Sequence, residues 1–432
     1  MASLAIRNAT VVDGDGTRRA DLLIQHGVVA EVSDSIDGAD TVIDADGLIV
    51  VPGFVDLRAN LCEPGAEEAE TLQTGSRGAA LGGYTAVVTT AGTEPIVDQL
   101  AVVNQIHDLA HDALCEVVPS ASITVGGAGE TLVPMAELVR AGVRIFADAD
   151  QGVQNARLMR TAFEYAAGLS HLADGFDVVL GQPCEVDALA AGGVMHEGDW
   201  SSRLGMPGQP AEAEELMVMR DIALARLTRG RVHFQRVSTA GSVDMIRAAK
   251  AAGLAVTAET TTHHLCLDHS ACASFDPVFK VDPPLRTPAD VAALRAGVLD
   301  GTIDAIATDH QPQTRQDKER PFLDAPAGVL GLETAFAVAN TDLGADAETL
   351  VAAFSLNPAR IAGIDDRHGG VIEPGRAANL TIIDLDEEWT ITGAAMASRS
   401  ANTPYEGRTV RGRVRHTLWN GELVVSMGEA TR

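Results

Sequence analysis

The sequence is poor in positive charge. It holds 32 lysine and arginine residues against 60 aspartate and glutamate residues, for a formal net charge of −28 at pH 7. A surface with this balance repels the phosphates of nucleic acids and the anionic headgroups of membranes, so neither is expected as a partner. Lysine itself is nearly missing, because only Lys250, Lys280 and Lys318 occur. Almost no position is therefore left for a carboxylated lysine that would bridge two metal ions.

Cysteines, aromatic residues and long apolar runs are also scarce. The five cysteines (Cys62, Cys115, Cys184, Cys266 and Cys272) are scattered and form no CxxC pair, so a disulfide framework is not expected. No apolar stretch approaches the roughly 18 residues that suggest a membrane-spanning helix. The first residues, MASLAIRNATVVDGDG, lack the pattern of a signal peptide. We therefore expect a cytoplasmic protein, with a core rich in Ala, Val, Leu and Ile because aromatics are only 4 % of the chain.

Both ends of the chain have the pattern of short β-strands. Residues 3–50 alternate apolar and polar side chains between Gly/Asp turns, as in ADLLIQHGVVAEV. The stretch from about 368 repeats this style, as in GRVRHTLWNGELVV. Because chain termini often lie close together, residues 1–50 and 367–432 are predicted to form one small composite β-sandwich domain.

The middle of the chain, residues 51–366, alternates strand-like apolar runs with amphipathic helical patterns such as Ala211–Leu227 and Ser242–Ala252. The predicted strands are Gly53–Leu57, Thr85–Thr90, Glu116–Pro119, Val143–Ala147, Val178–Gly181, Arg231–Val237, Ala255–Glu259 and Ala305–Asp309. Repeated βα units over about 300 residues are typical of a (β/α)8 TIM barrel. In that α/β fold, functional residues gather at the carboxyl ends of the strands.

A series of motifs runs through this middle region in a fixed order. They include PGFVDLRANLCEPG (52–65), GSRGAALGGYTAVVTTAGTEP (75–95), RVHFQRVSTAGSVDMIRAAK (231–250), FKVDPPLR (279–286), ATDHQPQ (307–313) and GVLGLETA (328–335). The series resembles the motifs of long microbial dihydroorotases, a family of the amidohydrolase superfamily, and it covers nearly the whole chain. The resemblance implies an amidohydrolase-type barrel, a place in pyrimidine biosynthesis and, in active relatives, zinc-dependent hydrolysis of a cyclic amide.

The departures from the family pattern fall on its working residues. In the family, histidines and an acidic residue or carboxylated lysine hold the metal ions. Those metal positions here carry Arg58, Asn60, Ala149, Pro183 and Arg236. The alignment at Ala149 can slip by one residue, which would bring in Asp148 or Asp150 instead. Only the aspartate that shuttles the proton in the family is kept, as Asp309.

Positions that contact the substrate in the family have changed as well. Cys62 replaces the arginine that binds the substrate carboxylate in the family, and Gly92 replaces an asparagine of the same site. Asp282 replaces a second asparagine, and Gln313 occupies a histidine-like position. A substrate that bears a carboxylate would meet less positive charge at Cys62 and added negative charge at Asp282.

These losses bear directly on metal binding. A zinc site needs three or four His, Cys or carboxylate ligands, and an arginine stays protonated with no lone pair to donate. A lone aspartate acting as a base contributes about 10²–10⁴-fold, short of the rate enhancements of about 10⁶-fold or more that enzymes typically reach. We therefore expect no cofactor, with zinc absent and Asp309 no longer functional in catalysis. Arg58 and Arg236 are expected to pair with Asp309 and to replace the charge of the metals.

Three functions are compatible with this pattern. The first, which we favour because the motifs that carry the fold persist, is a non-catalytic structural subunit, a pseudoenzyme. The resemblance extends to inactive relatives that support the assembly of aspartate carbamoyltransferase, so that enzyme is the expected partner, and a homo-oligomer is also expected.

The second function is an active dihydroorotase, or a related cyclic amidohydrolase, with a rearranged metal site. Its ligands would come from Asp148, Asp150, His310 and Cys184. The third is a metal-free anion-binding or regulatory module, in which Arg58 and Arg236 clamp the anion.

Overall fold

The computed structural model describes residues 3–149 and 151–432. The strands are β1 (Leu4–Asp13), β2 (Gly16–Gln25), β3 (Val28–Ser33), β4 (Thr41–Asp44), β5 (Ile49–Pro52), β6 (Phe54–Ala59), β7 (Tyr84–Thr89), β8 (Glu116–Pro119), β9 (Ile145–Phe146), β10 (Val179–Pro183), β11 (Met195–His196), β12 (Gly208–Gln209), β13 (Val232–Gln235), β14 (Val256–Thr261), β15 (Ala305–Ala307), β16 (Leu380–Thr390), β17 (Thr409–Trp419), β18 (Glu422–Ser426) and β19 (Glu429–Ala430). The α-helices are α1 (Leu72–Leu81), α2 (Leu100–Leu109), α3 (Met135–Arg140), α4 (Ala156–Ala166), α5 (Asp187–Ala190), α6 (Asp199–Leu204), α7 (Glu212–Thr228), α8 (Ala240–Ala251), α9 (Thr262–Cys266), α10 (Pro288–Leu299), α11 (Arg315–Lys318), α12 (Ala335–Asp342), α13 (Ala347–Val351) and α14 (Asn357–Ala362). Within the described ranges, no helix combines the length and apolar character needed to cross a bilayer.

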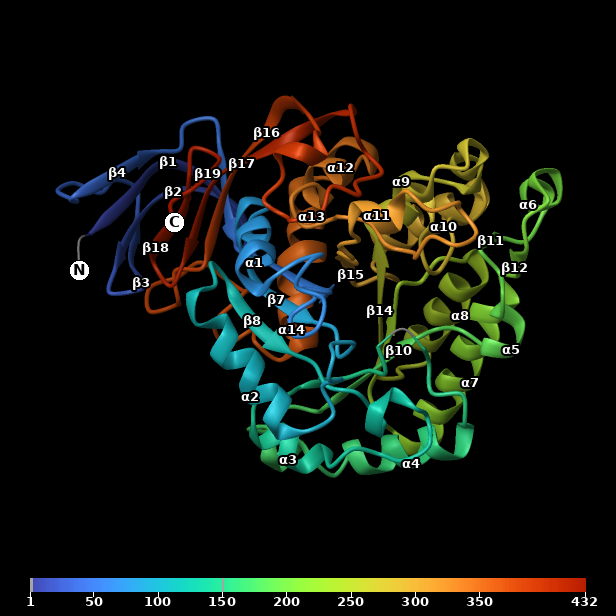
Figure 1. The fold of residues 1–432 in the computed structure, drawn as a ribbon. Helices are drawn as coiled ribbons and strands as arrows, with labels where there is room; N and C mark the ends of the chain where they lie inside the picture. Colours follow the sequence, from blue (N-terminus) through green and yellow to red (C-terminus); the bar gives the residue numbers. More distant parts are fainter. Residues whose placement is uncertain (1–2, 150) are drawn as a thin grey trace.

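Parallel strands close into a barrel at the centre of the molecule (Figure 1). β6, β7 and β8 pair in parallel as one group, and β9, β10, β13, β14 and β15 pair in parallel as another. Backbone bridges from Ala59 to His310 and from Ala121 to Phe146 join the two groups into a ring. Every strand predicted for the middle of the chain overlaps one of these, and α7 and α8 match the two predicted helices, so the (β/α)8 prediction is confirmed.

Strands from both ends of the chain build a second sheet beside the barrel. Its order is β19-β18-β17-β16-β5-β1-β2-β3, with β4 paired to β1. β16 joins β5 in antiparallel fashion, so residues 380–383 lie against residues 49–52. In Figure 1 the blue strands of the N-terminal part and the red strands of the C-terminal part lie together. The prediction that both termini together build one β domain is confirmed, and its strands form a single nine-stranded sheet, while the exact domain boundaries stay a prediction.

The chain passes from this sheet into the barrel at Gly53, between β5 and β6. A Cβ atom at Gly53 would lie 2.2 Å from the side chain of Thr85, so only glycine allows the two strands to approach this closely. The next residue, Phe54, packs on Phe336 with ring centroids 4.9 Å apart and on Phe354 at 5.5 Å. The few aromatic residues of the chain thus anchor the start of β6.

The side chains of β6 make two kinds of contact. Val55 and Leu57 belong to an apolar cluster that also contains residues of α14. The pairing of β6 with β7 shifts register between Asp56 and Ala59, so the regular alternation of side chains is interrupted before Arg58. Asp56 and Arg58 both contact the segment that follows β15. β6 therefore joins its two charged residues to the end of the last barrel strand.

Candidate functional site

A cavity of about 400 Å³ lies at the carboxyl ends of the barrel strands. β13 leads to it at Arg236 and β15 leads to it at Asp309. Further polar residues that line it come from β12 and from loops: Gln209, Lys280, Asp282, Gln311 and Gln313. Functional sites of (β/α)8 barrels lie at this end of the strands, so this cavity is the candidate site.

Arg58 and Asp309 form a buried ion pair at this site. The Arg58 Nε atom donates to Asp309 Oδ1 at 2.9 Å, and the two side chains are only 2 % and 6 % exposed. Arg58 also donates to Gln235 Oε1 at 3.3 Å and to the carbonyl oxygen of Ala149 at 2.9 Å. A buried carboxylate needs such a partner, because an unpaired charge in the interior is strongly destabilising. The pairing of Arg58 with Asp309 follows the prediction, whereas the contact with Gln235 was not foreseen.

The backbone around Asp309 holds its side chain in place. Asp309 has a φ of 46°, a left-handed conformation that is uncommon for a residue with a Cβ atom. The neighbouring backbone is fixed by the Thr308 amide, which donates to Asp56 Oδ1 at 2.9 Å. On the other side, the Asn60 amide donates to the carbonyl oxygen of His310 at 2.8 Å. These bonds stabilise the unusual conformation of the turn that presents Asp309 to Arg58.

Arg236 contacts Asp282 rather than Asp309. Its Nη1 atom donates to the carbonyl oxygen of Asp282 at 2.5 Å and lies 3.7 Å from Asp282 Oδ2. Arg236 follows β13 with a φ of 55°, and this turn directs its side chain to the loop before α10. Within the described ranges no bond joins Arg236 to Asp309, so this half of the predicted pairing is wrong.

Glu185 belongs to the site although it was not predicted as a site residue. Gln209, which lines the cavity, donates its side-chain amide to Glu185. Burial, together with the negative charge of Asp282, raises the pKa of Glu185 to about 7. A carboxyl group with that pKa can take up or release a proton near neutral pH. The feature of the sequence that could have identified Glu185 is its position, as an acidic residue just beyond the end of a predicted barrel strand.

Asp148, in the acidic segment after β9, binds backbone away from Asp309. Asp148 accepts the backbone N–H groups of Ile123 at 2.8 Å and Thr124 at 2.9 Å, so it ties down the loop after β8. Ala149 reaches the site only through its carbonyl oxygen, which binds Arg58. Asp150, the other predicted alternative, lies outside the described residues.

The remaining predicted ligand positions also point elsewhere. The Asn60 side chain accepts the backbone N–H two residues further along, at 2.9 Å. Pro183 has no ligand atom, and burial raises the pKa of the neighbouring Cys184 thiol well above its usual value. His310 Nε2 lies 3.5 Å from Glu70 Oε2, and its Nδ1 accepts the Gly331 N–H. None of these four residues lines the cavity beside Asp309.

The donor set therefore does not fit a zinc ion. Among the described residues, no three His, Cys, Asp or Glu side chains are grouped so that they could hold a metal. The guanidinium of Arg58 lies beside Asp309, the one working residue of the family that is retained. An arginine offers positive charge and hydrogen bonds but no lone pair to a cation.

Of the four predicted substrate positions, the structure brings two to the cavity. Asp282 and Gln313 line it, and Gln313 Nε2 donates to the carbonyl oxygen of Ala327 at 3.0 Å. Gly92 is exposed. Cys62 is buried, and this burial together with the charge of Glu70 raises its pKa to about 12. Cys62 is therefore a neutral thiol, which is a poor nucleophile.

The side chains that do line the cavity favour a small polar ligand. Arg236 and Lys280 supply positive charge. Three glutamines, Gln209, Gln311 and Gln313, carry amide groups that can both donate and accept hydrogen bonds. The arrangement can bind a small molecule that has a carboxylate and amide groups, with Asp309 available as a proton acceptor.

Comparison with known proteins gives a consistent set of relatives. A family model described as "Dihydro-orotase-like" matches residues 47–242. Proteins named dihydroorotase are 43 % identical in Pelotomaculum thermopropionicum (98 % of this chain, 98 % of the relative), 42 % in Mycobacterium tuberculosis (96 % and 97 %) and 41 % in Streptomyces coelicolor (100 % of both). The solved L-hydantoinase of Arthrobacter aurescens has a TM-score of 0.88 at 24 % identity, over 100 % of this chain and 98 % of that one, which shows a shared fold.

These relatives correct the expectation that the protein takes no cofactor. They are named dihydroorotase, a zinc-dependent family, and such identity along the whole chain points to a metalloenzyme. Their names lend no support to a pseudoenzyme or to a subunit of a carbamoyltransferase complex. The relatives thus indicate a metal, whereas the described side chains around Arg58 do not fit one.

Proposed function

This chain belongs to the dihydroorotase-like family, and from that membership we propose that it hydrolyses a cyclic amide of the dihydroorotate type in pyrimidine biosynthesis. The observation that carries the proposal is the 43 % identity to a protein named dihydroorotase over 98 % of the chain. The cavity at the carboxyl ends of the strands is where such a fold carries out chemistry.

The side chains of the cavity suit this class of substrate. Arg236 and Lys280 can hold the carboxylate of the substrate, since both are cations that line the cavity. The amide groups of Gln209 and Gln313 can hydrogen-bond the ring N–H and C=O groups. These contacts replace those that Cys62 and Gly92 no longer provide.

Proton transfer falls to the carboxylates of the site. Asp309 lines the cavity and is held in one orientation by Arg58. It can accept a proton from the attacking water and return it to the ring nitrogen when the amide bond breaks. Glu185, with a pKa of about 7, can exchange protons with solvent during the cycle.

The test combines two measurements on one freshly purified sample: dihydroorotate hydrolysis, and metal content by elemental analysis. We expect turnover that falls by about 10²-fold or more in Asp309→Asn, because a general base is lost. The matched control, Asp324→Asn, removes an exposed carboxylate and should leave the rate unchanged. No turnover, even after zinc is added, would overturn the proposal.

A second candidate function rests on the Arg58–Asp309 pair. A guanidinium bonded to the retained aspartate is consistent with a barrel that keeps its fold but not its catalytic activity, as in the inactive relatives that the sequence resembles. In this case the protein would be a structural subunit that supports the assembly of aspartate carbamoyltransferase. This protein would also form a homo-oligomer.

This second candidate is tested by co-expression with the carbamoyltransferase of the same organism. Co-purification at fixed stoichiometry, with loss of carbamoyltransferase assembly when this chain is omitted, would support it. Light scattering on the protein alone gives its own oligomeric state. A chain that never associates with that enzyme and does not affect its activity would rule the candidate out.

A further inference from the structure

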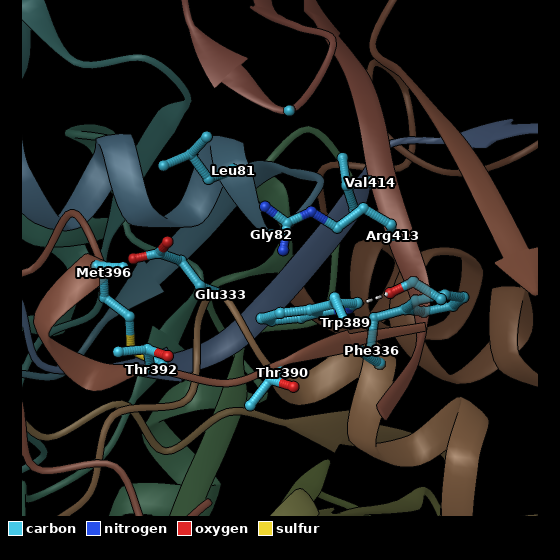
Figure 2. Close-up of a pocket in the computed structure, with 14 residues that line it drawn as sticks. Leu81, Gly82, Glu333, Phe336, Trp389, Thr390, Thr392, Met396, Arg413 and Val414 are labelled. Carbon is cyan, nitrogen blue, oxygen red and sulfur yellow. Dashed lines mark hydrogen bonds between the residues drawn. The ribbon is translucent and has the colours of Figure 1, made fainter. Parts of the chain in front are cut away.

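A second cavity, of about 220 Å³, lies away from the barrel mouth, where the C-terminal sheet meets the helices. Its walls come from the end of α1, from α12, from the loop after β16 and from β17 (Figure 2). A water molecule occupies about 30 Å³ of liquid volume, so the space is that of a small metabolite rather than of one or two waters. Neither Asp309 nor Arg58 takes part in its lining.

Two opposite charges face this cavity without touching. Arg413 stacks on the ring of Trp389, with its guanidinium carbon 4.4 Å from the ring centroid. In Figure 2 its side chain reaches from β17 toward the side of the cavity where Glu333 lies. Within the described ranges, no carboxylate lies within salt-bridge distance of Arg413. Its positive charge nevertheless acts to lower the pKa of Glu333, against the effect of burial. A gap therefore separates a cation from a carboxylate.

Both charged groups are held in position by the protein. Glu333 Oε1 accepts the Ala397 N–H at 2.7 Å, and burial raises the pKa of Glu333 to about 7. The Trp389 indole that supports Arg413 donates to the carbonyl oxygen of Gly412 at 3.0 Å. Stacking and hydrogen bonds of this kind fix a side chain before a ligand arrives and so reduce the entropy lost on binding.

The rest of the wall combines apolar side chains with hydroxyl groups. Leu81, Phe336, Met396 and Val414 line the cavity together with Thr390 and Thr392. Pockets that bind small molecules combine apolar side chains with polar groups that fix the orientation of the ligand. The ligand that matches has a carboxylate for Arg413, an N–H donor for Glu333 and an apolar body.

We propose that this cavity is a binding site for an apolar α-amino acid, whose carboxylate binds Arg413 and whose ammonium group binds Glu333. The site goes beyond the proposed hydrolase function and does not depend on it. It is connected to the barrel mouth, because Ala397 binds Glu333 while the adjacent Ser398 donates to Glu70. Glu70 in turn pairs with His310, the residue next to Asp309.

The test is calorimetric titration of the full-length protein with L-leucine, L-valine and L-phenylalanine at fixed pH. Two analogues separate the contacts: leucine amide lacks the carboxylate, and 4-methylpentanoate lacks the ammonium group. We expect saturable binding of at least one amino acid and weaker binding of its two analogues. Absence of binding by all three amino acids at millimolar concentration would overturn the proposal.

Three variants locate the site. Arg413→Gln and Glu333→Gln should each weaken binding about tenfold or more, the effect of losing one charged hydrogen bond. Arg411→Gln makes the same change on the same strand, at an exposed residue outside the cavity lining, and should bind as the parent does. Folding of each variant is checked by circular dichroism. Unchanged affinity in both cavity variants would place the ligand elsewhere and reject the assignment.

Discussion

The guanidinium of Arg58 and the carboxylate of Asp309 are 251 residues apart in the sequence, yet Nε and Oδ1 lie 2.9 Å apart where the first barrel strand meets the last. The neighbouring residues Ala59 and His310 form the backbone bridge that closes the barrel at the same place. The ion pair is thus part of the closure of the barrel as well as of the candidate site. A change to either Arg58 or Asp309 should therefore affect both the closure of the barrel and the candidate site.

Replacing Arg58 with methionine should destabilise the protein strongly. Arg58→Met leaves Asp309 as a buried carboxylate without its cation, which costs about 3–5 kcal/mol of unfolding free energy. The double variant Arg58→Met/Asp309→Asn should recover much of this loss, because both charges of the pair are removed. Urea unfolding of the three proteins gives the comparison.

The matched control for this experiment is an exposed pair. Arg160 and Glu164 form an i,i+4 salt bridge with side chains 53 % and 50 % exposed. Arg160→Met should therefore change stability by less than about 1 kcal/mol. Equal unfolding midpoints for Arg58→Met and Arg160→Met would show that the buried pair does not stabilise the fold.

Asp56 should make the protein less stable as pH rises toward neutrality. Burial is the main cause that raises the pKa of Asp56 to about 7, against hydrogen bonds from Thr308 that lower it. Between the pKa of an unfolded aspartate and pH 7, the folded state therefore binds one proton more than the unfolded state. Stability falls over this range by about 1.4 kcal/mol per pH unit from this group.

The isosteric variant Asp56→Asn should remove this slope while keeping the bond that Oδ1 accepts from the Thr308 amide. Denaturant unfolding between about pH 5 and pH 7 measures it. Asp386→Asn, at an exposed position, serves as the control and should keep the slope of the parent. A variant curve parallel to that of the parent would mean that Asp56 is ionised throughout this range.

The cysteines should be nearly inert in the folded protein. Burial raises the pKa of the Cys62 and Cys266 thiols to about 12 and that of Cys272 to about 11, and the reactive thiolate is then rare. Iodoacetamide followed by mass mapping should label all five sites only after unfolding. Ser270→Cys places a thiol at an exposed position and should react at once. Rapid labelling of Cys62 in the folded protein would show that its thiol is reactive enough to act as a nucleophile.

The sequence carried most of the information about the barrel. Strands such as β7 and β15 lie in apolar runs, and the motifs around them fix their order, so the fold followed from local pattern. The partner of Arg58 was also predictable, because Asp309 is the one acidic residue kept among the working positions of the family. Local pattern and motif order were enough for these two features.

Other features of the site depend on turns after the strands, and the pattern of apolar and polar residues in the sequence does not predict these turns. Arg236 was expected at Asp309, but the left-handed turn after β13 carries its side chain to Asp282. Asp148 was a candidate ligand, but β9 is only two residues long, and the chain then turns so that Asp148 caps the loop at Ile123. The direction of a side chain beyond a strand end depends on loop geometry and long-range contacts rather than on periodicity.

Glu116 should give the protein a stability that is lost in acid. Although burial opposes it, hydrogen bonds from His368 and Arg367 lower the pKa of Glu116 to about 2. Arg367 binds both carboxylate oxygens, Nη2 to Oε1 at 2.6 Å and Nε to Oε2 at 2.9 Å, and His368 Nε2 lies 2.8 Å from Oε2. Because an unfolded glutamate takes up its proton at higher pH than this folded one, stability falls as pH drops from about 4.5 toward 2.

Glu116→Gln tests this link between β8 and the segment after α14. The variant should lose about 1.5–3 kcal/mol at neutral pH, the contribution of hydrogen bonds to a charged group. It should also show a smaller loss of stability than the parent between about pH 5 and pH 3. Glu373→Gln changes an exposed glutamate and should match the parent in guanidinium unfolding at both pH values. If Glu116→Gln keeps the acid dependence of the parent, the carboxylate responsible lies elsewhere, and the Glu116–Arg367 contact does not stabilise the junction of barrel and sheet.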